Sequence, residues 1–128
     1  MKAKKILFID IENQPNEINR IKEHLEQYHL VAIVYAQQGG KLFTLDDLDF
    51  YAEKMQSGNL IVYKSPKSGK NAADFSITFL AGRITAVSPE ITHFDIVSND
   101  ADLDNAIGNL KYFGKTASRL SRAVQKKS

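Results

Sequence analysis

Three aspartates stand at every second residue after a short apolar run in the last third of the chain. The stretch is FDIVSNDADLD, residues 94–104, and its alternating acids are Asp100, Asp102 and Asp104. A second apolar run, residues 6–9, also ends on an acid, Asp10. Carboxylate oxygens are the ligands that Mg²⁺ and Mn²⁺ prefer, and such ions can hydrolyse phosphodiester bonds. If both runs are strands that end side by side, the sequence predicts a divalent-metal site.

The aspartate run has two other interpretations. Acids in a first helical turn are stabilised by the helix dipole, by roughly 0.3–1 kcal/mol each. That effect could account for one or two acids, but it accounts poorly for three beside Asn99. A calcium loop of the D-x-D-x-D type needs glycine at its sixth position and glutamate at its twelfth. The chain has Asn105 and Lys111 there, and no predicted helix precedes the loop, so we exclude an EF-hand.

The first acidic stretch contains Asp10, Glu12 and Asn13. An acid at the end of a buried apolar strand is costly unless it is paired or bound to a metal. Glu12 would lie on the same side of an extended chain as Asp10, and it is a further candidate ligand, as is Asp104. Asn13 could hold a carboxylate in place or contact a phosphate. The alternative for Asn13 is a plain helix N-cap.

A third candidate stretch is NAAD, residues 71–74. Asp74 opens a predicted helix after the third apolar run, where it could complete the acidic pocket. The alternative is capping, with Asn71 as the cap residue and Asp74 in the first turn. The preceding Gly69 and Lys70 resemble the end of a phosphate loop. A Walker A motif would need glycine at 64 and serine or threonine at 71, where Lys64 and Asn71 stand, so we reject that kind of nucleotide site.

Alternating strands and helices must position these side chains. Apolar runs predict buried strands at residues 6–11, 30–36, 60–63 and 91–97, and helical periodicity predicts helices at 18–28, 45–56, 71–87 and 101–113. This order predicts an α/β fold of three α/β/α layers around a mainly parallel sheet. Ligands bind outside the carboxyl ends of such strands, which is where Asp10 and Asp100 lie. We expect a domain of residues 1–114 and a basic tail of residues 115–128, helical or partly disordered.

Several classes of chemistry are excluded by composition. The chain has 128 residues and no cysteine, so disulfides, thiolate zinc sites and cysteine nucleophiles are ruled out. His24, His29 and His93 lack a zinc-binding spacing, and we expect His24 on the polar side of the first helix. No G-x-S-x-G elbow is present. The first apolar run is too short for a signal peptide or a membrane span, and we expect a cytoplasmic protein.

The positive charges are unevenly distributed although the net charge is only +2. Lysines and arginines gather in the turn after the third run and near the end of the chain, with acids between them. This pattern suits a phosphate-rich partner, although a solvated surface explains the basic end equally well. The candidate nucleic-acid contacts are Lys64, Lys67, Lys70, Lys111, Lys115 and Arg119.

The fragments ILFIDIEN, KNAADFSI and FDIVSNDADLDNAI, in this order, resemble the PIN-like nucleases and in particular their NYN-type branch. The resemblance covers residues 5–113. It implies a sheet of order 3-2-1-4, often followed by a fifth strand, and a ribonuclease that uses Mg²⁺ or Mn²⁺. Leu103 departs from the pattern, since phenylalanine is usual there. By position, the resemblance implies Asp10, Asp74, Asp100 and Asp102 as ligands, supported by Asn13, Ser98 and Asn99.

The sequence therefore predicts a metal-dependent ribonuclease whose acids meet at the carboxyl ends of the strands. The alternative is a non-catalytic PIN-like module that binds nucleic acid or a protein, because the end of the chain shows no clear fifth strand and is basic. The expected partner is RNA, with DNA left open. A second copy of the chain and an inhibitory protein are further candidate partners, and no membrane contact is expected.

Overall fold

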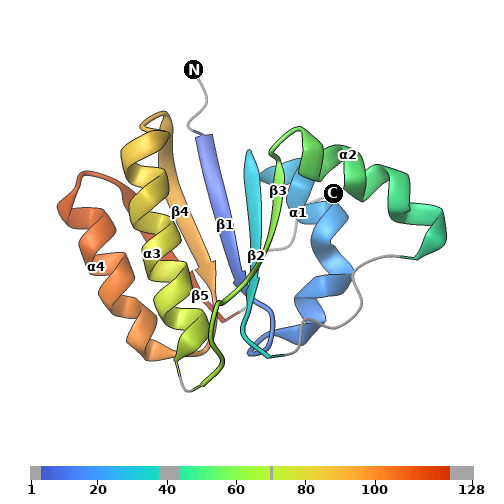
Figure 1. Ribbon diagram of the computed structural model, residues 1–128. Helices are drawn as coiled ribbons and strands as arrows, with labels where there is room; N and C mark the ends of the chain where they lie inside the picture. The colour runs from blue at the N-terminus through green and yellow to red at the C-terminus, as the bar shows by residue number, and fades with distance from the viewer. Residues whose placement is uncertain (1–3, 38–43, 70, 122–128) are drawn as a thin grey trace.

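The computed structural model describes residues 4–37, 44–69 and 71–121, and strands alternate with helices along them (Figure 1). The sheet order is β3-β2-β1-β4-β5 and each neighbouring pair is parallel. The prediction of a mainly parallel three-layer fold is confirmed. In the described residues the strands are β1 (Lys4–Asp10), β2 (Leu30–Tyr35), β3 (Leu60–Lys64), β4 (Ile91–Val97) and β5 (Thr116–Leu120).

The helices begin close to where the sequence places them, but three of them open with a tighter turn. Pro15 starts the first of these 3-10 segments, at a position where its missing N–H costs nothing. The 3-10 segments are Pro15–Arg20, Leu45–Asp47 and Ala101–Leu103. The α-helices in the described part are α1 (Ile21–Gln27), α2 (Leu48–Gln56), α3 (Ala72–Val87) and α4 (Asp104–Tyr112). None of the described helices is long and apolar enough to cross a membrane.

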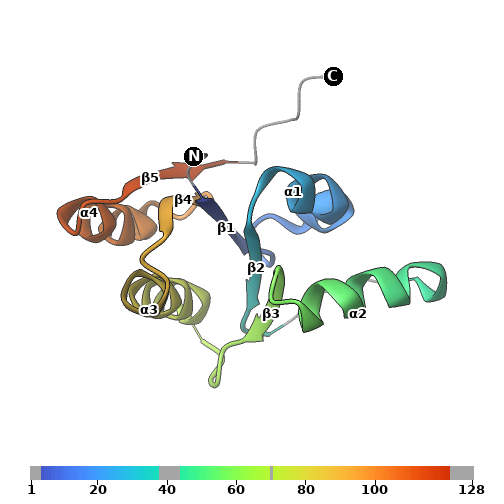
Figure 2. The same cartoon turned by 90° about the horizontal axis from the view of Figure 1, so that it is seen from above.

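Strand β1 lies at the centre of the sheet and has helices on both sides. Figure 2 shows α3 and α4 on one face and α1 and α2 on the other. Alternate β1 side chains serve the two faces: Phe8 packs on the α3 side with Phe94, and Leu7 packs on the α1 side. The rings of Phe8 and Phe94 are stacked 6.5 Å apart between their centroids. This double burial explains why the strand reads as an unbroken apolar run.

The register of the sheet brings the two acidic stretches together. Ile9 of β1 pairs with Val97 of β4, so Asp10 and Ser98 follow on neighbouring strands. Asp10 also pairs with Val34 of β2, on the other side of β1. The carboxyl ends of β2, β1 and β4 therefore form one edge of the molecule, as the topology predicts.

The helical prediction for the end of the chain is wrong between residues 116 and 120. These residues form β5, which pairs with β4 from His93↔Thr116 to Val97↔Leu120. An edge strand buries little of its surface, and only Ala117 is fully buried here, so the segment lacks the apolar run of a central strand. The predicted domain boundary at 114 therefore falls one element too early. Residues 122–128 of the predicted tail lie outside the described residues.

The prediction for His24 is also wrong. His24 is fully buried, and its Nε2 lies 2.7 Å from Oε2 of Glu17, which is itself buried. Burial lowers the pKa of the His24 imidazole, and the neighbouring Glu17 carboxylate opposes that shift. The helical pattern gave no sign of this pair because Glu17 belongs to the 3-10 segment before α1.

Candidate active site

Asp10 and Ser98 join the ends of β1 and β4. The Asp10 side chain is almost fully buried, and its Oδ2 accepts a hydrogen bond from Ser98 Oγ at 3.0 Å. The same Ser98 oxygen accepts the backbone N–H of Asp100 at 3.1 Å. One buried hydroxyl therefore orients the Asp10 carboxylate and also fixes the start of the aspartate run.

Asn13 ties together the two loops that follow these strands. Its Oδ1 accepts the backbone N–H of Asn99 at 2.7 Å. The residue at the N-cap position of the following 3-10 segment is Gln14, and no side-chain capping bond is made there. Of the two interpretations of Asn13, the structure favours the one in which it positions the acidic loop.

Asp74, Asp100 and Asp102 form a cluster with ligand spacing. One carboxylate oxygen from each lies within 4.8 Å of the others. Asp74 comes from the first turn of α3, whereas Asp100 and Asp102 flank the start of the 3-10 segment after β4. Asp100 Oδ1 also accepts the Asp102 N–H at 2.9 Å, so this carboxylate caps the 3-10 segment as well. Capping leaves unexplained why Asp74 lies so close to both.

Asp74 has the least favourable environment of the predicted ligands. It is buried, and within the described part of the chain its Oδ2 has no hydrogen-bond partner. Burial, followed by the nearby Asp100, raises the pKa of Asp74 to about 7. The capping interpretation of this stretch is not met, since Asn71 makes no side-chain capping bond and adopts a left-handed φ of 65°.

The pKa of Asp10 is raised as well. Burial is the main cause, and the charges of Glu12 and Asp100 add to it, whereas the hydrogen bond from Ser98 opposes it. Like charges held this close favour protonation of one group or the binding of a cation. A buried carboxylate oxygen without a donor, within an all-oxygen donor set, fits a hard divalent cation such as Mg²⁺ or Mn²⁺. The residues present therefore suit the metal that the sequence predicts.

An open hollow of about 380 Å³ unites these groups. Asp10, Glu12, Asn13, Asp74 and Asp100 line it, together with Gln37 and Asn71. Sequence reasoning missed Gln37, because nothing in its type or position relates it to the acids, and it considered Asn71 only as a helix cap. Glu12 reaches the hollow, but its Oε1 accepts the backbone N–H groups of Ala36 and Gln37. It is thus in the pocket but outside the carboxylate cluster.

Asp104 forms an ion pair instead of joining the carboxylate cluster. Its exposed carboxylate pairs with Arg119, with 2.8 Å between Oδ1 and Nε. This ion pair lowers the pKa of Asp104. Arg119 also donates to the carbonyl oxygen of Ser98 at 3.2 Å. The structure therefore gives Asp104 and Arg119 a shared role in fastening β5 to the loop after β4.

The predicted nucleic-acid contacts divide into two groups. Lys64, Lys67 and Lys111 are exposed. Lys115 instead donates its ammonium to the carbonyl oxygens of Pro89 and Ile91, at 3.1 and 2.8 Å. Lys70 lies outside the described residues. Exposed lysines near an acidic pocket can hold a phosphate backbone, whereas Lys115 already serves the fold.

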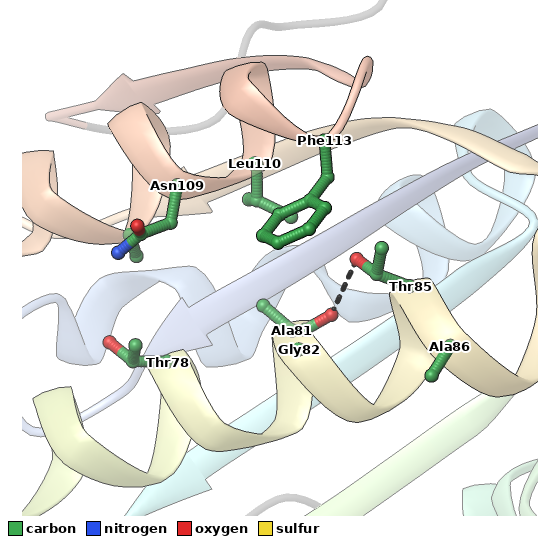
Figure 3. Close-up of a pocket in the computed structure, with 9 residues that line it drawn as sticks. Thr78, Ala81, Gly82, Thr85, Ala86, Asn109, Leu110 and Phe113 are labelled. Atoms are coloured by element: carbon green, nitrogen blue, oxygen red, sulfur yellow. Dashed lines mark hydrogen bonds between the residues drawn. The ribbon is translucent and has the colours of Figure 1, made fainter.

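A second hollow, of about 450 Å³, lies between α3 and α4. Figure 3 shows the Phe113 ring turned into it from the end of α4, opposite Ala81 and Thr85 of α3. No charged residue lines it. It therefore offers no group for acid–base or metal chemistry.

The chain belongs to the PIN domain family, since the model of the PIN domain matches residues 4–120. The match covers the whole sheet, from β1 to β5, and each of the predicted metal ligands. It supports a nuclease activity in general, in agreement with the acidic cluster at the carboxyl ends of the strands. No curated protein matches the chain.

Among solved structures, the chain is similar to a mutant ferredoxin-NADP⁺ reductase from Plasmodium falciparum. The two are 12% identical with a TM-score of 0.48, over 92% of this chain and 52% of that one. The chain thus spans about half the length of that structure. We draw nothing about function from a similarity at this level.

Proposed function

We propose that the protein is a divalent-metal-dependent ribonuclease that hydrolyses phosphodiester bonds, of the NYN-type branch of the PIN domain family. The observation that carries this proposal is the convergence of Asp74, Asp100 and Asp102 oxygens within 4.8 Å of one another, beside buried Asp10. These acids come from three separate stretches of the sequence, and capping does not explain why they meet.

In this proposal the polar side chains at the carboxyl edge of the sheet have distinct tasks. Asp10, Asp74, Asp100 and Asp102 would hold the Mg²⁺ or Mn²⁺. The bound metal would supply an activated water and stabilise the charge that develops on the phosphate. Ser98 and Asn13 keep the loops at the spacing that the acids need. Asp74 gives up its proton near pH 7, at its raised pKa of about 7, so the site is ready for a cation at neutral pH.

The exposed cations of the same region would hold the substrate. Lys64 ends β3 and Lys67 lies in the turn that follows, and both side chains are exposed. Contacts of this kind give affinity that falls with salt and does not depend on sequence. The choice of RNA over DNA and a cytoplasmic location remain predictions from the sequence.

The direct test is RNA cleavage with Mg²⁺ or Mn²⁺, with and without a chelator, on the unchanged protein and on Asp10→Asn. We expect cleavage that needs the metal and is lost in the variant. Cleavage that survives both the chelator and the substitution would overturn the proposal. Parallel reactions with a DNA of the same sequence test the choice of substrate.

The alternative function, a non-catalytic module that binds nucleic acid or a protein, was based on two features of the sequence, and one of them is not found in the structure. It relied on a missing fifth strand, and β5 is present. Its other motive, the basic end of the chain, lies largely outside the described residues. It still makes a distinct prediction, namely salt-dependent RNA binding without turnover and without saturable Mn²⁺ binding. A Mn²⁺ isotherm that Asp100→Asn abolishes would exclude it.

A further inference from the structure

Beside the acidic pocket, two neighbouring backbone amides donate hydrogen bonds to a carboxylate of the protein itself. Glu12 Oε1 accepts the N–H groups of two successive residues, Ala36 and Gln37, the second at 2.9 Å. Both follow directly after β2, at the carboxyl edge of the sheet. Successive N–H groups that converge on one point form a concave site for an anion. The structure thus contains an anion site that is filled from within.

The position of Glu12 is electrostatically unfavourable for a fixed charge. Its carboxylate lies close enough to Asp10 to raise the pKa of that group. Glu12 is exposed, so its side chain could extend into water and reduce the repulsion. It lies instead on the two amides, whose N–H groups stabilise a carboxylate there against the like charge nearby.

The amide pair also lies where two hollows meet. The acidic hollow and a neighbouring one of about 410 Å³ are both lined by Ala36 and Gln37. The second hollow continues to Lys64 and Ser65 at the end of β3. Lys64 pairs in register with Tyr35, the residue before the amides. A chain of phosphates that leaves the acid cluster by this path would pass the two amides and then an exposed cation.

We propose that the Ala36 and Gln37 amides form the subsite for a phosphate next to the one that is cleaved. Glu12 fills this subsite in the free protein, and a backbone phosphate of the substrate displaces it. The displaced carboxylate then leaves room for a nucleic-acid chain running from the acid cluster toward Lys64. This inference rests on the proposed function, because it takes the acid cluster as the point of cleavage.

The test compares the removal of two acids, Glu12 on the amide pair and Asp102 in the carboxylate cluster. Binding of a short single-stranded RNA is measured with a chelator present, so that no cleavage occurs, for Glu12→Ala, Glu12→Gln and Asp102→Ala. Loss of one charge should tighten binding by about fivefold in each variant, the effect of a unit charge about 4 Å away in water. Glu12→Ala also frees two amides for the phosphate, which should add about another tenfold. Glu12→Gln keeps a neutral acceptor on the amides and should fall between.

Amide resonances report on the subsite directly. In ¹H–¹⁵N spectra, the Ala36 and Gln37 signals should move when inorganic phosphate is added to Glu12→Ala, and should move much less in Asp102→Ala. The same gain in RNA affinity for Glu12→Ala and Asp102→Ala, or phosphate-insensitive amides in Glu12→Ala, would overturn the inference. If Glu12→Ala is poorly folded, Glu12→Gln against Asp102→Asn repeats the comparison with a smaller expected gain for Glu12→Gln, because a neutral amide oxygen holds the two N–H groups less tightly than a carboxylate.

The two proposals can fail separately. A protein that cleaves RNA while its Ala36 and Gln37 amides ignore phosphate retains the proposed function and loses the subsite. A protein whose amides bind the RNA backbone, but which never cleaves it with any divalent metal, retains the subsite and loses the proposed catalysis.

Discussion

Helix α3 joins two hollows that differ in almost every chemical respect. Its first turn carries Asp74 into the acidic pocket, and its second half lines the apolar hollow against α4 (Figure 3). The apolar hollow is the larger, about 450 against 380 Å³. Size therefore says little about which hollow does chemistry. The difference lies in whether the polar groups of each hollow are satisfied by the protein itself.

Two hydroxyl groups of the apolar hollow are satisfied within α3 itself. The hydroxyl of Thr78 donates to the Asp74 carbonyl and that of Thr85 to the Ala81 carbonyl, both at 2.8 Å. Among the described residues, the acidic pocket instead leaves a buried Asp74 oxygen without a partner, and it holds Asn71 in a left-handed conformation. Groups kept in unfavourable states at one end of a stable helix are typical of sites where function limits stability.

The largest difference should appear when one acid of the pocket loses its charge. Asp100→Asn should lower metal-dependent RNA cleavage by about 10³-fold, as loss of a strong electrostatic contact to a transition state does. Its thermal stability should not fall, because the substitution relieves repulsion with Asp74. The measurements are initial rates at saturating Mn²⁺ and a melting curve.

Asp104→Asn is the matched control for this loss of charge. Asp104 belongs to the same aspartate run, but it pairs with Arg119 outside the cluster. Its cleavage rate should stay within a few-fold of the unchanged protein. If Asp100→Asn and Asp104→Asn lowered the cleavage rate equally, the whole aspartate run would act through its summed charge. The cluster of Asp74, Asp100 and Asp102 would then have no distinct role in cleavage.

The apolar hollow should respond in the opposite way. Leu110 lies in its floor and is 4% exposed. Leu110→Ala should lower the free energy of unfolding by about 3 kcal/mol, the usual cost of a buried leucine. Urea denaturation measures the loss. Below the melting temperature, Mn²⁺ affinity should be unchanged, and a large drop in that affinity would show that the two hollows are coupled through α3.

The same contrast explains what the sequence could and could not predict. The central strands could be predicted because both of their faces are buried, so β1 and β2 contain continuous apolar runs. Strand β5 could not be predicted in this way. Its five residues form a strand because they pair with β4, and among them only Ala117 is buried. Its Ala117 and Leu120 happen to have helical spacing, and local pattern cannot reveal a partner strand.

The acids were predictable for a related reason. A carboxylate at the end of an apolar run is conspicuous, and parallel topology brings the ends of neighbouring strands to one edge. The roles of Glu12, Ala36 and Gln37 were not predictable, because backbone amides leave no trace in residue types. The burial of His24 was hidden likewise, as its partner Glu17 lies in a different helical segment.

The thermal stability of the metal-free protein should depend on pH through Asp74 of the acidic pocket, and the apolar hollow should not contribute to that dependence. Its pKa is raised to about 7 by burial and then by Asp100. A raised carboxyl pKa gives stability that is present below about pH 4 and is lost as the pH rises through about 7. The metal-free protein should therefore melt at a lower temperature at pH 8 than at pH 5, and Asp74→Asn should reduce that difference.

Mn²⁺ binding should show the reverse trend. Because one proton must leave Asp74, the affinity should rise about tenfold per pH unit below pH 7 and then level off. Titration calorimetry at several pH values measures this slope. Asp104 offers a contrast, since Arg119 lowers its pKa and its contribution to stability disappears only as the pH falls through the acid range. A flat Mn²⁺ affinity between pH 5 and 7 would contradict the role given to Asp74.

The smallest test uses one substitution at two glycines. Gly82 lies in α3 beside the apolar hollow, and a Cβ added there would meet nothing within 4 Å. Gly82→Ala should raise the free energy of unfolding by about 0.5–1 kcal/mol, through helix propensity alone. Gly69 lines the acidic pocket and also has open space, but its φ of 136° is one that alanine rarely adopts. Gly69→Ala should therefore destabilise the protein, and urea denaturation of both variants should give opposite signs. If both substitutions stabilised the protein, the backbone at Gly69 could relax to accept alanine. The acidic pocket would then differ from the apolar hollow in charge but not in backbone strain.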